Sequence, residues 1–263
     1  MHLRLDAALD VTRAYAQHLS ECPELGPECK LGPVDPIQHR TTLWLSNLRL
    51  LGEYGLAPNL ALQATLPLRL VDTRTQFADL NGNLLGPEVA SIHHRNETLF
   101  GFGDPQLLMH GARFFSGPAV GVRGGVSIPL GKTQPNPFRL GELGLPHEHI
   151  QFGSGTIDPV LGVDVARAFG KFSFGAFAFT QVPLLRNLHG YQQGASLNGG
   201  VSLALPTPTA IWRLSAIALH EWPERWGGVV PEEDGNQGRS DLFLSPGVTL
   251  PFATDWSASL DVR

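Results

Sequence analysis

The sequence predicts an all-β fold, a transmembrane up-and-down antiparallel β-barrel, and three observations support this prediction. Short and long connections alternate along the chain. The segments between them alternate apolar and polar side chains with the period of two that a strand imposes. Most of these segments have roughly 10–15 residues, which suits a tilted crossing of a bilayer better than the usual length of about 5–6 residues in globular sheets.

The connections form two classes that alternate along the chain. The short ones carry residues typical of tight turns and lie at residues 55–59, 115–119, 170–171, 206–210 and 251–255. The longer ones are polar excursions at residues 18–38, 72–98, 131–154, 187–190 and 223–238. Strict alternation puts every long connection at the same end of an up-and-down sheet, as in outer-membrane barrels, which have brief periplasmic turns and longer extracellular loops.

The first segment shows the strand period clearly. Leu3, Leu5 and Leu9 fall on one face while Arg4 and Asp6 fall on the other, whereas a helix would mix the two sets. Five further segments alternate in the same way, and they span residues 60–70, 120–130, 157–165, 197–205 and 256–262. We therefore expect a lipid-facing apolar side and a lumen-facing polar side on each strand.

The alternation also predicts which polar side chains face the lumen and line a permeation path. These are Arg4, Asp6, Asp10, Gln63, Arg69, Asp104, Gln106, His110, Arg123, Asp158, Asp164, Asn198 and Arg213. Mixed charges facing one another across a narrow pore would pair and partly fill it, which argues against strong charge selectivity. The excursion at residues 72–98 is long enough to fold inward as a constriction.

Two stretches are less regular and leave a soluble fold open. Residues 41–54 carry leucines on both faces, and residues 172–186 are nearly apolar on both sides. Such runs fit strands of a narrow or plugged barrel, and they also fit a soluble sandwich or a lipocalin-like ligand binder.

The strand count predicts a chain that is one strand short of closure. About eleven strands fit the pattern, whereas bacterial barrels of one chain close with an even number, so we expect about twelve strands in the intact barrel. The chain ends within an apparent strand at Asp261-Val262-Arg263, and no signal peptide precedes the first strand. Residues 1–263 are therefore expected to form a single outer-membrane barrel domain that lacks its signal peptide and final strand.

Composition excludes several other classes of protein. Charged residues make up 16% of the chain and the formal net charge is −5, so no basic surface for nucleic acid is expected. No apolar run reaches the roughly 18 residues of a transmembrane helix. The expected partners are outer-membrane lipid and small-molecule solutes.

The two cysteines, Cys22 and Cys29, lie seven residues apart in the first long excursion. An exported loop in an oxidising compartment favours a disulfide between them, and two free thiols are the alternative. Their spacing is not that of a zinc site.

The candidates for metal binding and catalysis are weak. His147 and His149 would share one face of a strand and could hold one transition-metal ion, although histidines in exposed loops are more often solvated. Ser154 lacks the Gly-x-Ser-x-Gly elbow and its following helix. We expect neither an enzyme nor a cofactor.

The five tryptophans predict an interfacial girdle. Trp44, Trp212, Trp222, Trp226 and Trp256 fall at or near predicted strand ends, where membrane barrels place aromatic residues. In a soluble β protein they would be core residues instead.

Short glycine-rich motifs add a family resemblance. Residues 99–107 contain a Gly-aromatic-Gly-Asp strand start, residues 121–132 a Ser-Ile-Pro-Leu-Gly strand end, and residues 152–162 a Gly-Ser-Gly-x-x-Asp-Pro strand start. With the hairpin at residues 53–62, these motifs resemble the outer-membrane β-barrel family named for the meta-cleavage pathway of phenol degradation.

This resemblance implies a porin-like channel of the bacterial outer membrane that passes small, often hydrophobic or aromatic compounds. Asp104 and Asp158 in the motifs would lie near the mouth of the lumen, either hydrated there or bonded to turn amides. A second possibility is a structural or partner-binding barrel with a plugged lumen, which does not transport.

Overall fold

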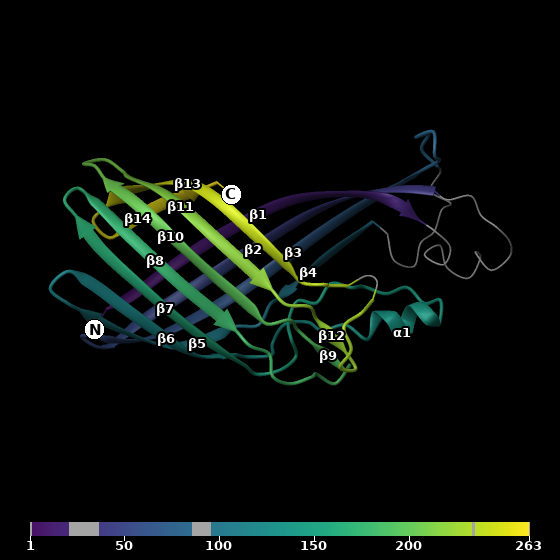
Figure 1. The fold of residues 1–263 in the computed structure, drawn as a ribbon, viewed down its shortest axis with the longest axis horizontal. Coiled ribbons are helices and arrows are strands. Elements are labelled where there is room, and N and C mark those ends of the chain that lie inside the picture. Colours follow the sequence, from purple (N-terminus) through teal and green to yellow (C-terminus); the bar gives the residue numbers. More distant parts are fainter. Residues whose placement is uncertain (1, 21–36, 86–95, 233–234, 263) are drawn as a thin grey trace.

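A single antiparallel sheet that curls on itself forms most of the molecule (Figure 1). The computed structural model describes residues 2–20, 37–85, 96–232 and 235–262. The long strands are β1 (Leu3–Ser20), β2 (Ile37–Ala57), β3 (Leu60–Ala78), β5 (Gln106–Phe114), β6 (Pro118–Ser127), β7 (Asp158–Phe169), β8 (Phe172–Gln181), β10 (Ser196–Pro206), β11 (Ile211–Glu221) and β13 (Arg239–Ala253). The shorter elements are β4 (Glu97–Phe102), β9 (Tyr191–Gln192), β12 (Arg225–Trp226), β14 (Trp256–Asp261) and α1 (Pro137–Glu142).

The all-β up-and-down prediction is confirmed. Hydrogen-bonded neighbours follow the order β1-β2-β3-β5-β6-β7-β8-β10-β11-β13-β14, which gives eleven strands in sequence order. β4 and β5 both pair with β3, at its residues 68–73 and 60–65, so they form one strand that is interrupted at Gly103-Asp104-Pro105. The motif at residues 101–104 is therefore a break within a strand, and the prediction that it starts a strand after a loop is wrong.

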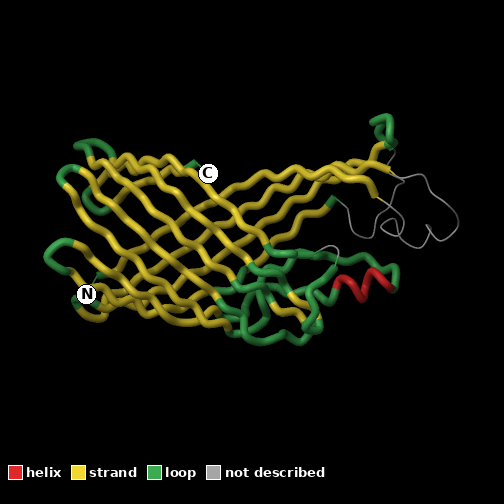
Figure 2. Tube along the Cα trace, viewed as in Figure 1, coloured by secondary structure: helices red, strands yellow, loops and turns green. Residues whose placement is uncertain are grey.

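All the long connections lie at one end of the sheet, as predicted, and the tight turns lie at the other (Figure 2). We call these the loop end and the turn end. No helix in the described part of the chain is long and apolar enough to cross a membrane.

The first three strands are longer than predicted and extend beyond the rest of the sheet (Figure 1). β3 continues to Ala78 instead of ending near Asp72. Its outward face changes from leucine to Asp72, Arg74 and Gln76 while the hydrogen-bonded ladder with β2 continues. The apolar pattern therefore ends near Asp72, whereas the strand itself continues to Ala78.

Cross-strand partners share a face, so the register assigns every side chain to one side of the sheet. The predicted apolar positions are on the outward side and are exposed: Leu161 has 58% and Val163 52% of its surface accessible. On the inner side of the same strand, Val160 is fully buried. This is the opposite of a soluble sandwich, in which the apolar faces pack against each other.

The edges of the sheet are β1 and β14. β14 pairs only with Gly247–Ala253 of β13, and the described residues show no ladder between β14 and β1. Both strands run from the turn end to the loop end, because they are the first and last of eleven alternating strands. They therefore cannot pair antiparallel with each other, and the sheet is open between them.

Candidate functional site: the lumen and its mouth

The register places the predicted lumen residues on one face. Twelve of the thirteen belong to strands, and all twelve lie on the inner side: Arg4, Asp6, Asp10, Gln63, Arg69, Gln106, His110, Arg123, Asp158, Asp164, Asn198 and Arg213. Asp104 lies in the break between β4 and β5. Their role in permeation stays a prediction.

Charged side chains of the inner face pair along the wall of the lumen. Arg123 Nη2 lies 3.2 Å from Asp164 Oδ1 on the adjacent strand, and Arg49 Nη2 lies 2.8 Å from Asp10 Oδ2. His110 Nδ1 lies 3.1 Å from Glu53 Oε2, two strands away. The prediction that opposite charges meet across the pore is therefore wrong for these pairs, because each joins strands on the same wall.

Bidentate geometry strengthens one more pair near the edge of the sheet. Arg213 Nε donates to Asp261 Oδ1 at 3.3 Å, and Arg213 Nη2 donates to Asp261 Oδ2 at 2.9 Å. Such fork-like pairs hold both side chains in one orientation. This pair also runs along the wall and leaves the centre of the lumen clear.

At several glycines of the inner face, a side chain from a neighbouring strand occupies the space that a Cβ atom would fill, and we call these positions glycine seats. A Cβ atom on Gly162 would lie 2.9 Å from Phe179 Cδ2, and one on Gly200 would lie 2.8 Å from Phe177 Cε1. The carboxylate of Asp164 lies in the same way over Gly121. These side chains lie flat against the wall, so they take up less of the lumen than upright side chains would.

An apolar strip also faces the lumen, and the sequence analysis missed it. It consists of Phe177, Phe179, Ile217, Leu219 and Phe243, on β8, β11 and β13. Phe177 remains 40% exposed on the inner side. The sequence feature that indicates this strip is the presence of aromatic residues on both faces of residues 172–181. It was missed because only polar residues were considered as candidates for the lumen.

Three connections fold together at the loop end, and their described residues are 128–157, 182–195, and 222–232 with 235–238 (Figure 1). Tyr191 and Trp226 pair their backbones in the β9–β12 ladder, and their rings lie 4.9 Å apart. Phe138 at the start of α1 contacts both Trp226 and His149, with ring centroids at 6.3 and 5.3 Å. This aromatic cluster gives the loop end a packed core of its own.

The interfacial prediction for Trp226 is wrong, because the side chain belongs to the aromatic cluster. Only 6% of Trp226 is exposed, and its Nε1 donates to Glu224 Oε1 at 3.0 Å. Trp222 is exposed and stacks edge-on against His220 at 4.2 Å. Trp44, Trp212 and Trp256 are exposed on the outward face, as an interfacial position requires.

Glu224 is a buried carboxylate within the same cluster. Burial raises its pKa above the ordinary value, and the hydrogen bonds from Trp226 and the backbone of Asn236 oppose this shift only in part. Protonation therefore favours the packed form of this loop.

The rings of His147 and His149 pack edge-on at 5.1 Å instead of lying on a strand. His147 is buried, and its Nδ1 lies 2.8 Å from the carbonyl oxygen of Leu145. Within the described ranges, no group of three or more His, Cys, Asp or Glu side chains is arranged to hold a metal ion. The cysteines Cys22 and Cys29 lie outside the described residues.

Asp104 ties the first of the three connections to the barrel wall. Its Oδ1 accepts from the amide of Gly131 at 2.8 Å, and its Oδ2 accepts from the amide and hydroxyl of Ser154 at 2.7 and 3.0 Å. Both ends of the connection at residues 128–157 are thereby held at the strand break. Asp104 has the structural role that the sequence analysis gave as one of two possibilities.

Asp158 belongs to a buried network and is not a hydrated lumen residue. Its carboxylate accepts from Thr156 Oγ1 at 2.6 Å and from Gln181 Nε2 at 3.2 Å, and no part of it is exposed. Gln106 Nε2 in turn donates to Gln181 Oε1 at 3.3 Å. The network joins β5, β7 and β8 just below the mouth, so the prediction that the Asp158 charge stays hydrated is wrong.

Tyr191 lies between the two facing walls at the mouth. It is buried and within electrostatic range of Arg69 and Asp104 from one wall and of Glu221 and Glu224 from the other. Burial, reinforced by the charge of Glu224, raises its pKa, so the phenol stays neutral. Residues 182–195 therefore bring Tyr191 within electrostatic range of inner-face residues of both β3 and β11. Residues 72–78, which we expected to fold inward, continue β3 beyond the rim.

Arg69 is an inner-face cation within electrostatic range of Tyr191. It forms no hydrogen bond or ion pair with any side chain in the described part of the structure, although Asp104, Tyr191 and Glu221 lie within electrostatic range. The carboxylates of Asp104 and Glu221 are engaged by other donors. Arg69 is therefore a partly buried cation of the inner face without a direct partner among the described residues.

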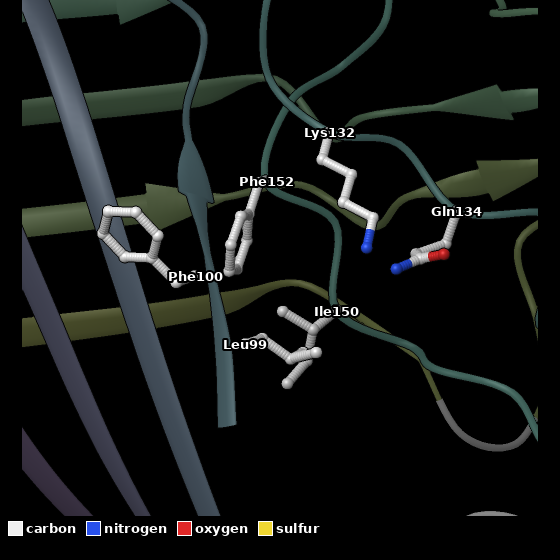
Figure 3. A pocket seen from close by; sticks show the side chains of 6 residues that line it. All are labelled: Leu99, Phe100, Lys132, Gln134, Ile150 and Phe152. Carbon is white, nitrogen blue, oxygen red and sulfur yellow. The ribbon is translucent and has the colours of Figure 1, made fainter. Parts of the chain in front are cut away.

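A small cleft opens beside β4 (Figure 3). Its lining residues are Leu99, Phe100, Lys132, Gln134, Ile150 and Phe152. The volume of about 20 Å³ admits a water molecule but no organic solute. The cleft is a packing defect between the first connection and β4.

Known proteins resemble the chain through its fold. Neither models of protein families nor curated protein sequences match it. Among solved structures, it is similar to an outer membrane channel from Pseudomonas putida F1, with a TM-score of 0.53 and 13% sequence identity over 82% of this chain and 73% of that chain. At this identity the likeness concerns the fold, and the chain has the fold of an outer-membrane β-barrel.

Proposed function

We propose that this protein is a passive, porin-like channel of the bacterial outer membrane for small hydrophobic or aromatic compounds. The observation that carries the proposal is the inner face, where glycine seats hold Phe177, Phe179 and Asp164 flat against the wall. A structural barrel gains nothing from a cleared lumen. The solute gradient is the driving force, and no cofactor takes part.

The composition of the lumen supports the choice of solute. Paired charges on β1 to β7 neutralise one another along one wall, while Phe177, Phe179 and Phe243 present aromatic faces on the other. An aromatic solute gains stacking contacts on such faces without a single-sign ring of charge to cross.

Conductance in a planar bilayer tests the channel. Arg123→Ala removes an inner charge, so its single-channel conductance or ion selectivity should differ from that of the wild type. Val122→Ala on the outward face of the same strand is the matched control and should leave both unchanged. The proposal is contradicted if the protein inserts into the bilayer but conducts no ions. It is also contradicted if no substitution on the inner face changes the conductance.

A plugged barrel that does not transport is the second candidate, and the packed loop end favours it. Tyr191 and Trp226 are buried and pack ring against ring in the connections that fold together at this end. Liposome swelling separates the two functions, because a plugged barrel admits no solute. If swelling occurs only after Tyr191→Ala, the wild-type lumen is closed and the second candidate holds.

A further inference from the structure

Two adjacent tight turns at the turn end gather three basic side chains. One turn joins β5 to β6 at residues 115–117, and the other joins β7 to β8 at residues 170–171. Arg113, Arg167 and Lys171 belong to these two hairpins. We call them the turn-end basic cluster.

The register brings the two arginines to the same side of the sheet. Arg113 pairs with Val120, and Pro118 pairs with Arg167, so both side chains share the outward face with β6 between them. Strands two apart are separated by about 10 Å, which long side chains can span to reach one shared anion. The Arg167 guanidinium already extends to the neighbouring turn, where its Cζ lies 3.4 Å from the position of a Cβ on Gly117.

The three cations have no counter-ion within the described ranges of the chain. Among the described residues, none of them forms a hydrogen bond or an ion pair, and each instead lies over a phenylalanine ring. The rings are those of Phe115, Phe169 and Phe172, at 4.6 to 5.5 Å from the cationic atom. The nearest carboxylate along these strands, Asp164, points into the lumen and pairs with Arg123.

The surroundings of the cluster are apolar and exposed. Phe115, Phe169 and Phe172 all remain accessible around it, and Val163 continues the outward face above it. Basic side chains beside an aromatic girdle lie at the level of lipid headgroups. Acyl chains would contact the phenylalanines while the phosphate contacts the cations.

We propose that the turn-end basic cluster binds the headgroup phosphate of an anionic phospholipid. The proposal rests on the membrane setting of the proposed function, in which the turn end faces the periplasm. The three hairpin cations would bridge one headgroup across β6 and so fix the depth of the barrel in the leaflet.

The test compares lipid binding by two triple variants of the refolded full chain in detergent. Arg113→Gln, Arg167→Gln and Lys171→Gln together remove the cluster, while Arg13→Gln, Arg40→Gln and Arg74→Gln remove the same charge from the outward face near the loop end. Native mass spectrometry measures binding of short-chain phosphatidylglycerol, with phosphatidylcholine and inorganic phosphate as further probes. The cluster variant should lose about a hundredfold in affinity for phosphatidylglycerol, and the control variant should retain it.

Equal affinity in the cluster variant and the wild type would overturn the proposal, and so would an equal loss in both variants. Phosphatidylcholine binding as tight as phosphatidylglycerol binding, or displacement by millimolar inorganic phosphate, would also overturn it. If the triple variant fails to fold, Arg167→Gln is compared with Arg167→Lys, which keeps the charge and should keep the binding. The conductance of the wild type is measured separately, so that the two proposals are tested independently. A barrel that conducts ions but does not bind this lipid contradicts only the lipid site. A barrel that binds the lipid but does not conduct contradicts only the channel function.

Discussion

At the scale of single residues, the inner face contains charges in two different states. Most are neutralised by a partner on the same wall, as Arg123 is by Asp164, whereas Arg69 at the mouth lacks a direct partner in the described structure. A paired charge shapes the lumen, and an unpaired charge acts on the ions that pass. The two kinds of residue therefore give different results when they are neutralised.

Arg69→Gln should shift the reversal potential in a salt gradient toward cation selectivity, because it removes an inner-face cation that has no direct partner among the described residues. Bilayer recordings under a tenfold salt gradient measure the shift. Arg74→Gln is the matched control, since Arg74 lies on the outward face of the same strand and pairs with Asp72. An identical reversal potential in Arg69→Gln and the wild type would show that ions do not pass close to this side chain.

Glu224 makes the loop end sensitive to pH. Its pKa is raised in the folded loop, so its contribution to stability is fully present below the pKa of an unfolded glutamate and is lost as pH rises through the higher folded value. Hydrogen exchange in residues 222–232 should accordingly slow as pH falls through this window, after correction for intrinsic exchange rates. Glu224→Gln should remove the pH dependence, and a dependence that survives this substitution would assign it to another group.

Alternation in the sequence predicted the side of each lumen residue, because period two is a property of any strand. It could not predict that Asp158 is buried or that Trp226 packs on Tyr191. Both outcomes depend on connections that fold back over the sheet, and a period within one strand carries no information on contacts between distant loops.

At the scale of elements, hairpins and glycine seats set the shape of the lumen. Each seat depends on a neighbouring strand, as Gly162 of β7 does on Phe179 of β8. Sequence reasoning predicted the hairpins from their turn residues, and it predicted neither the extension of β3 to Ala78 nor the break at residues 103–105. Backbone hydrogen bonds with β2 continue β3 to Ala78. The break at residues 103–105 is stabilised by hydrogen bonds that the Asp104 carboxylate accepts from the distant amides of Gly131 and Ser154.

Gly162→Ala should lower the conductance, because the added methyl group displaces the Phe179 ring toward the centre of the lumen. Gly199→Ala is the control, since this glycine lies on the outward face of β10 and a Cβ there meets only a backbone oxygen at 3.4 Å. Single-channel recording measures both variants. Equal conductance in Gly162→Ala and the control would mean that Phe179 has room to move without narrowing the path.

Asp104→Ala should release the connection at residues 128–157, because it removes three hydrogen bonds at once. Hydrogen exchange at the amides of Gly131 and Ser154 should accelerate. The expected loss in the free energy of local opening is about 1.5–3 kcal/mol for each hydrogen bond to the charged carboxylate. Asp164→Ala removes an inner carboxylate that bonds no loop amide, and exchange in the same connection should not change. Unchanged protection in Asp104→Ala would mean that the aromatic cluster alone holds the loop.

At the scale of the whole molecule, the outward face of the sheet determines where the protein can reside. Leucines and valines are exposed from β1 to β14, and the inner face carries the polar residues. This arrangement was predictable because it repeats in every strand. β1 and β14 are not joined by a ladder in the described residues, and the odd number of strands, which the sequence also indicated, rules out antiparallel closure between them.

Val201→Arg should impair assembly in a bilayer by about 2–4 kcal/mol, because it places a charge on the lipid face near the middle of β10. Ser202→Arg is the matched control on the inner face of the same strand, and it should assemble normally. Urea titration of folding into liposomes measures both. Equal assembly of the two variants would show that the outward face of β10 does not contact lipid.

The extension of β1, β2 and β3 past the other strands has a practical consequence. The outward side chains of β3 in this extension are mostly polar from Asp72 onward. The extension leads to a compact turn in which Asp79 accepts from the backbone and side chain of Asn83 at 2.8 and 2.7 Å. In the proposed orientation, this extension of β1, β2 and β3 projects from the bilayer on the outer surface of the cell. An epitope tag inserted after Leu80, which is exposed, would report surface display by antibody on living cells without touching the solute path.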